Sequence, residues 1–236
     1  MTQLAFSDCW YWFLLAAVVC YFIGCFNFAV FISRFLKRDI RNVGSGNPGT
    51  MNMTRTYGLK IGAINFFCDV IKGGVPVLCA HFIFKNYVFA DTNVLVSDFA
   101  RYFFGCFVII GHVFPVSMKF KGGKGIASTL GLFLFSMPCE KWWYVFICIG
   151  LFICTLSYIA IFKWGSMGSL FGVTAFSIWQ AAEFYLEYSD CLLNGYIISV
   201  FMFLLFLNVI TWARHSVNIY NLFAGEERKT LDKKRK

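Results

Sequence analysis

The chain has 236 residues and a net charge of +9, with 59% hydrophobic and only 14% charged residues. Its mean hydropathy of +0.67 is too high for an ordinary soluble globular domain. Several apolar stretches also approach the roughly 20 residues that cross a bilayer. Membrane topology and attraction to anionic lipids explain the excess of basic residues. We therefore expect membrane lipids, and no nucleic acid, as partners.

Taken in chain order, seven segments are candidates for membrane helices. They cover about residues 10–33, 61–84, 98–118, 125–138, 141–162, 167–188 and 195–213. Segment 125–138 is shorter than a full crossing, so its length does not decide whether it spans the bilayer. We predict an all-α integral membrane protein with about seven transmembrane helices. It forms a single domain over residues 1–236 and ends in a basic cytoplasmic tail at 225–236, of which KTLDKKRK is expected to be disordered.

The basic residues indicate an orientation. Six Lys and Arg side chains lie between residues 34 and 60, three lie between 119 and 124, and seven follow from Arg214 onward. The connections on the opposite side carry few. By the positive-inside rule, the N-terminus lies outside and the C-terminus lies in the cytoplasm.

The ten cysteines include no CxxC pair, and most of them lie inside apolar runs. Cysteine in such runs behaves as a small hydrophobic residue, so the spacing predicts neither a disulfide framework nor a metal site. A disulfide among Cys9, Cys139 and Cys191, which lie near the outer side, is left open.

Four polar segments interrupt the apolar chain, and the predicted topology brings all of them to the cytoplasmic side. They are 43–58, 119–125, 163–169 and 214–221. The first contains Arg55, whose guanidinium suits bidentate recognition of a phosphate. The second, KFKGGKG, offers lysines and glycine amides that can form an anion-binding nest. It is not a Walker A loop, because Gly125 follows Lys124. Either segment alone also fits a topology-fixing loop or a linker, but together the four predict phosphate chemistry at a membrane surface.

Of the ionisable residues within the apolar segments, Asp69, Lys72 and His112 are candidates for a role in the site. Asp69 and Lys72 are three residues apart in segment 61–84, so they share a helix face and can pair. Residues at such depth are candidates for function, although structural pairing is favoured here. His112 is likewise more typical of a hydrogen-bonded structural residue than of a catalyst. His215 and Asn218 share a face if the last helix continues through them.

Several of these stretches together resemble a known family. SGNPGTMN followed by Arg55, GHVFPVSMKFKGGKG and RHSVNIYNLFAGEE resemble the three cytoplasmic motifs of the bacterial acyl-phosphate:glycerol-3-phosphate acyltransferases, the PlsY type. CDVIKG and WGSMGSL resemble two further patterns of that family. The resemblance covers about residues 43–229. It implies a seven-helix enzyme of the bacterial inner membrane with a cytoplasmic active site and no cofactor. The enzyme would move an acyl chain from acyl phosphate to the 1-hydroxyl of glycerol 3-phosphate, giving lysophosphatidic acid and phosphate.

The resemblance also implies roles for individual residues. The expected catalytic residues are Ser45, Arg55, Lys124, His215 and Asn218. The expected substrate-binding residues are Asn47, Gly49, Asn52, Lys121, Gly122, Gly123, Gly125 and Ser166. Supporting or structural roles are expected for Asp69, Lys72, His112 and Glu227. The family's Ala-Thr pair in the first motif is replaced by Thr50-Met51, which leaves the role of that threonine undecided.

Two alternatives stay open at this point. His215 could accept the proton of the substrate hydroxyl, or it could help to hold a phosphate while an acyl phosphate oxygen takes the proton. The second role is favoured. A transporter or flippase of a phosphorylated lipid would use the same cationic patch without chemistry. It predicts ionisable residues at mid-membrane in broken helices, which only Asp69 and Lys72 approach.

Overall fold

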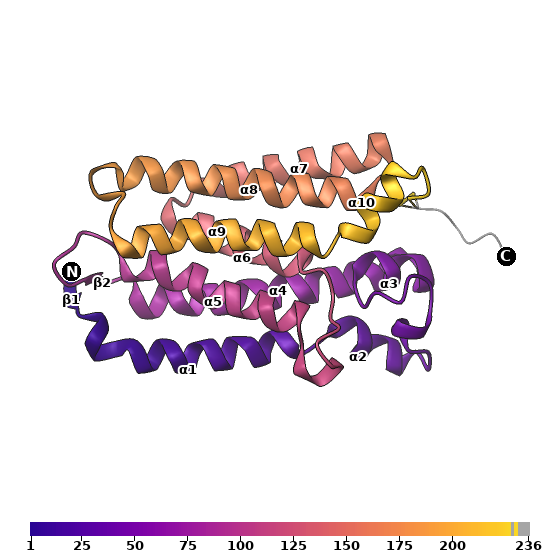
Figure 1. The fold of residues 1–236 in the computed structure, drawn as a ribbon, viewed down its shortest axis with the longest axis horizontal. Helices are drawn as coiled ribbons and strands as arrows, with labels where there is room; N and C mark the ends of the chain where they lie inside the picture. The colour runs from indigo at the N-terminus through magenta and orange to yellow at the C-terminus, as the bar shows by residue number, and fades with distance from the viewer. Residues whose placement is uncertain (228, 231–236) are drawn as a thin grey trace.

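The computed structural model describes residues 1–227, 229 and 230, which form an almost entirely helical bundle (Figure 1). The α-helices of this part of the chain are α1 (Phe6–Cys25), α2 (Phe28–Phe35), α3 (Thr50–Tyr57), α4 (Leu59–Phe84), α5 (Val96–Val113), α6 (Ile126–Glu140), α7 (Tyr144–Phe162), α8 (Gly165–Glu187), α9 (Gly195–Ala213) and α10 (Ser216–Phe223). Short 3-10 helices lie at Ile40–Asn42, Val116–Met118 and Ser189–Cys191. The all-α prediction holds apart from two three-residue strands, β1 (Thr2–Leu4) and β2 (Tyr87–Phe89), which pair in parallel.

The centre of the bundle is α5, which packs against α1, α4, α6 and α9. Within an apolar 18-residue window of Val96–Met118, 72% of the residues are buried, whereas the share in the corresponding window of α7 is 6%. A helix that is apolar and exposed in this way is stable only with lipid around it. We therefore treat α7 as a lipid-facing helix and α5 as the core of the membrane domain.

Two pairs of helices approach each other closely through glycines. A β-carbon on Gly73 of α4 would overlap the carbonyl oxygen of Ser128 in α6, and one on Gly131 of α6 would overlap that of Val70 in α4. Gly24 and Gly111 allow the same close approach between α1 and α5. Small residues at helix contacts are typical of membrane bundles, because dispersion contacts between backbones must replace a hydrophobic driving force.

Five helical stretches of the described chain are long and apolar enough to cross a membrane. They are Phe6–Phe35, Leu59–Phe84, Val96–Met118, Tyr144–Phe162 and Gly195–Ala213. α6 has 15 residues, which confirms that segment 125–138 is short. α8 has 23 residues but is less apolar, because it begins with GSMGS and carries Gln180 and Glu183. The chain is thus a multi-pass membrane protein, and the seven-helix count and the orientation stay predictions.

The segment expected at 10–33 is broken into α1 and α2. The side chain of Asn27 accepts a hydrogen bond from the amide of Val30 at 2.9 Å and donates one to the carbonyl of Pro48 at 3.1 Å. It therefore caps α2 and ties the break to the first polar segment. The bundle has two distinct ends: β1 and β2 mark one, and α3 and α10 mark the other (Figure 1).

All ten cysteines lie within the described residues and are free thiols, Cys9, Cys139 and Cys191 included.

Candidate active site

The first polar segment is shaped by Asn52. Its side-chain nitrogen donates to the carbonyls of Ile40 at 3.2 Å and Val43 at 2.9 Å, and its oxygen accepts from the amide of Ser45 at 3.1 Å. Asn52 is only 2% exposed, whereas Ser45 is exposed. The buried amide thus holds the loop that presents Ser45 to solvent. Asn47 and Gly49 lie between them, and Gly49 forms the N-cap of α3.

The glycine loop, residues 119–125, leads into the first turn of α6. The amides of Gly122 and Gly123 donate inward, to the carbonyls of Val113 and His112, both at 3.1 Å. Gly125 has a φ of +84°, which favours glycine, and it is the N-cap of α6. The first-turn amides of a helix have no intrahelical acceptor, so an anion here would meet the N-terminus of α6 rather than the two glycine amides.

A polar cluster joins the glycine loop to the C-terminal segment. Lys124 donates to the side-chain oxygen of Asn218 on α10. Glu227 accepts from Asn218 at 2.9 Å and from the hydroxyl of Ser166, in the first turn of α8, at 2.7 Å. Burial lowers the pKa of Lys124 to about 8. The Glu227 carboxylate opposes this shift, and Arg214 and Arg55 add to it. Three segments far apart in the sequence therefore meet in one polar cluster through Lys124, Asn218, Glu227 and Ser166.

Arg55, the cation of α3, reaches the end of the described chain. Its guanidinium donates to the carbonyls of Lys229 at 3.1 Å and Thr230 at 3.4 Å. Thr230 in turn donates to the carbonyl of Lys163, just before α8, at 2.9 Å. Residues 229 and 230 of the predicted tail therefore lie against the site, and the prediction for residues 228 and 231–236 falls outside the described residues.

His215 lies between α9 and α10 and is 3% exposed. Its Nδ1 lies 2.7 Å from the carbonyl oxygen of Thr211, so Nδ1 carries the proton and donates. Burial, with a smaller contribution from the positive charges of Lys124 and Arg214, lowers the pKa of His215 to about 4, and the hydrogen bond to Thr211 opposes this shift. At neutral pH the ring is therefore uncharged, and its Nε2 has a free lone pair.

The remaining expected residues lie nearby in different settings. Lys121 is exposed. Asp69 and Lys72 form the expected ion pair, at 3.2 Å, and both side chains are buried. His112 contacts Lys72 beneath the glycine loop, with 2.8 Å between Nδ1 and Nζ. All four polar segments meet at the α3/α10 end of the bundle (Figure 1).

Comparison with known proteins agrees with this arrangement. A family described as glycerol-3-phosphate acyltransferase matches residues 14–225. The chain belongs to this family. It is 34% identical over 221 residues to a glycerol-3-phosphate acyltransferase of Finegoldia magna, covering 92% of this chain and 95% of that one. It is 38% identical over 222 residues to glycerol-3-phosphate acyltransferase 2 of Thermotoga maritima, covering 92% and 96%.

The fold also matches solved structures of an integral membrane glycerol 3-phosphate acyltransferase, PlsY (YgiH). Its glycerol 3-phosphate form superposes with a TM-score of 0.73 at 28% identity, covering 92% of this chain and 94% of that one. Its lysophosphatidic acid form gives 0.71 at 27% identity with the same coverage. The family assignment therefore rests on sequence and fold together.

Sequence reasoning assigned no role to one side chain in the site of this glycerol-3-phosphate acyltransferase. Arg214 donates to the carbonyl of Gly122 at 3.1 Å, and its guanidinium lies 5.8 Å from the ring centre of Phe114. It thus connects the C-terminal end of α9 to the middle of the glycine loop and to Phe114, which precedes the loop. Its place directly before His215, in a chain with few charges, was the available signal.

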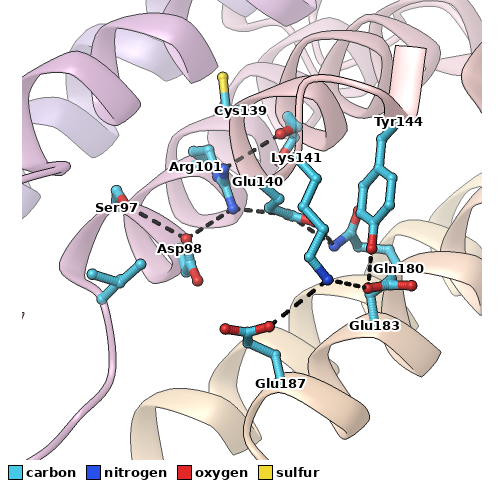
Figure 2. Close-up of polar contacts among 12 residues, drawn as sticks. Ser97, Asp98, Arg101, Cys139, Glu140, Lys141, Tyr144, Gln180, Glu183 and Glu187 are labelled. Atoms are coloured by element: carbon cyan, nitrogen blue, oxygen red, sulfur yellow. Dashed lines mark hydrogen bonds and ion pairs between the residues drawn. The ribbon is translucent and has the colours of Figure 1, made fainter. Parts of the chain in front are cut away.

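A second polar cluster lies at the opposite end of the acyltransferase, where α5 begins shortly after β2 (Figure 1), and Figure 2 shows its contacts. Arg101 of α5 is fully buried and pairs with Asp98 at 2.9 Å and Glu140 of α6 at 2.8 Å. Gln180 of α8 donates to both oxygens of Glu140. The sequence placed Arg101 only near a helix start, because nothing local announces a partner 39 residues away.

Proposed function

We propose that this chain transfers a fatty acyl group from acyl phosphate to the 1-hydroxyl of glycerol 3-phosphate, giving lysophosphatidic acid and phosphate. The reaction would take place at the cytoplasmic face of a bacterial inner membrane. The family and the two solved forms of one relative, a glycerol 3-phosphate form and a lysophosphatidic acid form, support the acceptor and the product. The observation that carries the proposal is the convergence of Arg55, Lys124 and His215 at one end of the bundle.

Both substrates carry a phosphate, so the site must hold two anions next to each other. Arg55 carries a planar fork of donors, which meets the carbonyls of Lys229 and Thr230 in this structure and would have to turn from them to a phosphate. Lys124 carries a partly buried ammonium, and the N-terminus of α6 carries backbone amides. Lys121, which is exposed, can attract a second phosphate from solution. Holding the hydroxyl and the acyl carbonyl in reacting geometry is then the main contribution to rate.

The neutral state of His215 points to its role. With Nδ1–H donating to Thr211, the ring can accept a hydrogen bond at Nε2 but cannot donate one to a phosphate. We therefore assign His215 to orienting the glycerol hydroxyl. With a pKa near 4 it is a weaker base than a phosphate oxygen, whose second pKa is about 6.

In this scheme the C–O bond forms between the glycerol oxygen and the acyl carbon, and the acyl–phosphate bond breaks. The hydroxyl proton ends on the departing phosphate. Lys124 and Arg55 stabilise the negative charge that develops on that group. No covalent acyl-enzyme is needed, because the mixed anhydride already has a good leaving group.

The test is phosphate release from purified protein given acyl phosphate. Release should require glycerol 3-phosphate and should yield one lysophosphatidic acid for each phosphate. Efficient turnover with acyl-CoA in place of acyl phosphate would overturn the donor assignment. A covalent acyl adduct on Ser45 or on a cysteine would overturn direct transfer. Movement of lysophosphatidic acid across vesicles without phosphate release would favour a flippase instead.

A further inference from the structure

The buried ammonium of Lys72, inside α4, contacts three different helices. Its Nζ lies 3.2 Å from the carboxylate of Asp69 on the same helix and 2.8 Å from Nδ1 of His112 on α5. It also donates to the carbonyls of Gly24 at 3.3 Å and Phe26 at 2.9 Å, at the break between α1 and α2. The side chain is 2% exposed. A simple ion pair would need only Asp69, so the other contacts ask for an explanation.

On one side these contacts reach the glycine loop. The imidazole of His112 packs directly against Gly123: a β-carbon there would overlap Nε2. The carbonyl of His112 accepts the Gly123 amide at 3.1 Å. Because Lys72 fixes the ring from beneath, the position of His112 and that of the loop before Lys124 are linked.

On the other side the contacts reach α3. The side-chain nitrogen of Asn65 lies 3.2 Å from Asp69 and 3.2 Å from the hydroxyl of Thr50. Thr50 is the first residue of α3, the helix that carries Arg55. The break in the first span is tied to the same region, because Asn27 bonds to Pro48 two residues before Thr50.

We propose that Lys72 and His112 are positioning residues that hold the glycine loop and the start of α3 in one register, so that the cations of both segments face one site. The proposal rests on the proposed function, because it assigns these residues to the placement of that site's anion-binding groups. Neither residue touches the reacting atoms. Their effect passes through Gly123 on one side and through Asp69, Asn65 and Thr50 on the other.

Arg101 offers a matched comparison within the same chain (Figure 2). It too is a buried cation paired at i,i+3, with Asp98, but it lies at the opposite end of the bundle and contacts none of the four polar segments of the site in the described structure. Both Lys72→Met and Arg101→Met leave a buried carboxylate unpaired and should lower the melting temperature. Only the first should disturb the glycine loop.

The first measurement is amide hydrogen exchange over residues 119–125 in detergent-solubilised protein, which needs no activity. Lys72→Met and His112→Phe should raise exchange at the Gly122 and Gly123 amides at least tenfold. Arg101→Met should leave that segment unchanged. Equal protection of the segment in all three variants would overturn the proposal.

The second measurement separates KM from kcat. Gly123→Ala, whose β-carbon meets His112, should raise the KM of one substrate. Lys72→Met should raise the same KM by about tenfold or more, the scale on which mutating the outer-shell partner of a metal ligand lowers affinity or activity. His112→Gln keeps an acceptor for Lys72 and should recover most of the affinity that His112→Phe loses.

If Lys72→Met does not fold, the His112 pair of variants carries the test alone. A KM unchanged in His112→Phe, with activity falling only in step with melting temperature as in Arg101→Met, would overturn the positioning role. Failure of the wild-type protein to release phosphate would instead count against the proposed function and would leave the exchange result standing.

Discussion

At the scale of single residues, His215 gives the most specific chemical prediction, because one of its ring nitrogens donates a hydrogen bond and the other can only accept one. Nδ1 is occupied by Thr211, and Nε2 remains an acceptor. Glutamine also offers an acceptor, so His215→Gln should retain turnover, with a raised KM for glycerol 3-phosphate and less than about a hundredfold loss in kcat. His215→Phe, which has no acceptor, should lose more. A kcat loss of about 10²–10⁴ in the Gln variant, with binding intact, would make His215 the general base.

The lowered pKa of Lys124 predicts that kcat/KM falls on the alkaline side of its pH profile. Burial places its pKa at about 8, below the ordinary value of a lysine, so the ammonium loses its proton as the pH rises through 8. kcat/KM, which reports the free enzyme, should therefore fall above about pH 8. Lys124→Arg keeps the charge at all accessible pH values and should remove this limb even if its maximum is lower. An unchanged limb in that variant would assign the ionisation to another group.

The sequence predicts a residue's partner only where the spacing along one helix brings the two residues together. The pairing of Asp69 with Lys72 follows from a spacing of three, and it is present. The engagement of Asn52 with the loop before it does not follow from spacing, because its partners Ile40 and Val43 are set by tertiary folding. The same holds for the inward amides of Gly122 and Gly123. The sequence motif identifies the glycine loop, but only the folded backbone shows which of its amides are still available to a ligand.

At the scale of helices, the close contact of α4 with α6 gives a stability prediction. Gly73→Ala places a methyl group against the backbone of Ser128, which cannot move aside without shifting α6. Overpacking of this kind should destabilise the protein by about 1–3 kcal/mol. Gly150→Ala on α7 is the matched control, because a β-carbon there has nothing within 4 Å. It should be neutral or slightly stabilising, since alanine favours a helix over glycine.

Thermal unfolding in detergent compares the two variants directly. A lower melting temperature for Gly73→Ala alone supports the close contact. Equal melting temperatures would mean that the helices lie further apart than the structure places them.

The length of each apolar run predicted that a helix forms there, but it did not predict where a helix is interrupted. Each of the seven apolar segments contains an α-helix. The break at Asn27 was missed because the flanking residues are apolar on both sides, and an asparagine there becomes a cap only when Pro48 lies within reach. α8 is helical as expected, but its glycines, Gln180 and glutamates make it less apolar than the five candidate spans.

At the scale of the whole molecule, the placement of the polar segments limits the possible topology. Contacts join 119–125 to Arg214 and Asn218, and 163–169 to Glu227 and Thr230, so these segments must share one side of the membrane. The basic residues concentrate in the same segments. The positive-inside rule then predicts that this side is the cytoplasm, where water-soluble glycerol 3-phosphate would be available.

Reporter fusions test the topology without reference to activity. Fusions after residues 58, 124 and 225 should report a cytoplasmic location, and fusions near residues 91, 139 and 190 should report the outside. The pair 124 and 139 is the most informative, because α6 between them has only 15 residues and must cross if the two ends differ.

A helix of 15 residues is about 22 Å long, less than the roughly 30 Å hydrocarbon core. It is sheltered by α4, α5, α7 and α8 rather than by lipid, so protein contacts can offset the short length. If residues 124 and 139 report the same side, α6 is re-entrant and the total number of crossings is smaller than seven. If residue 124 reports the outside while 225 reports the cytoplasm, the contact between Lys124 and Asn218 cannot exist and a single active site is excluded.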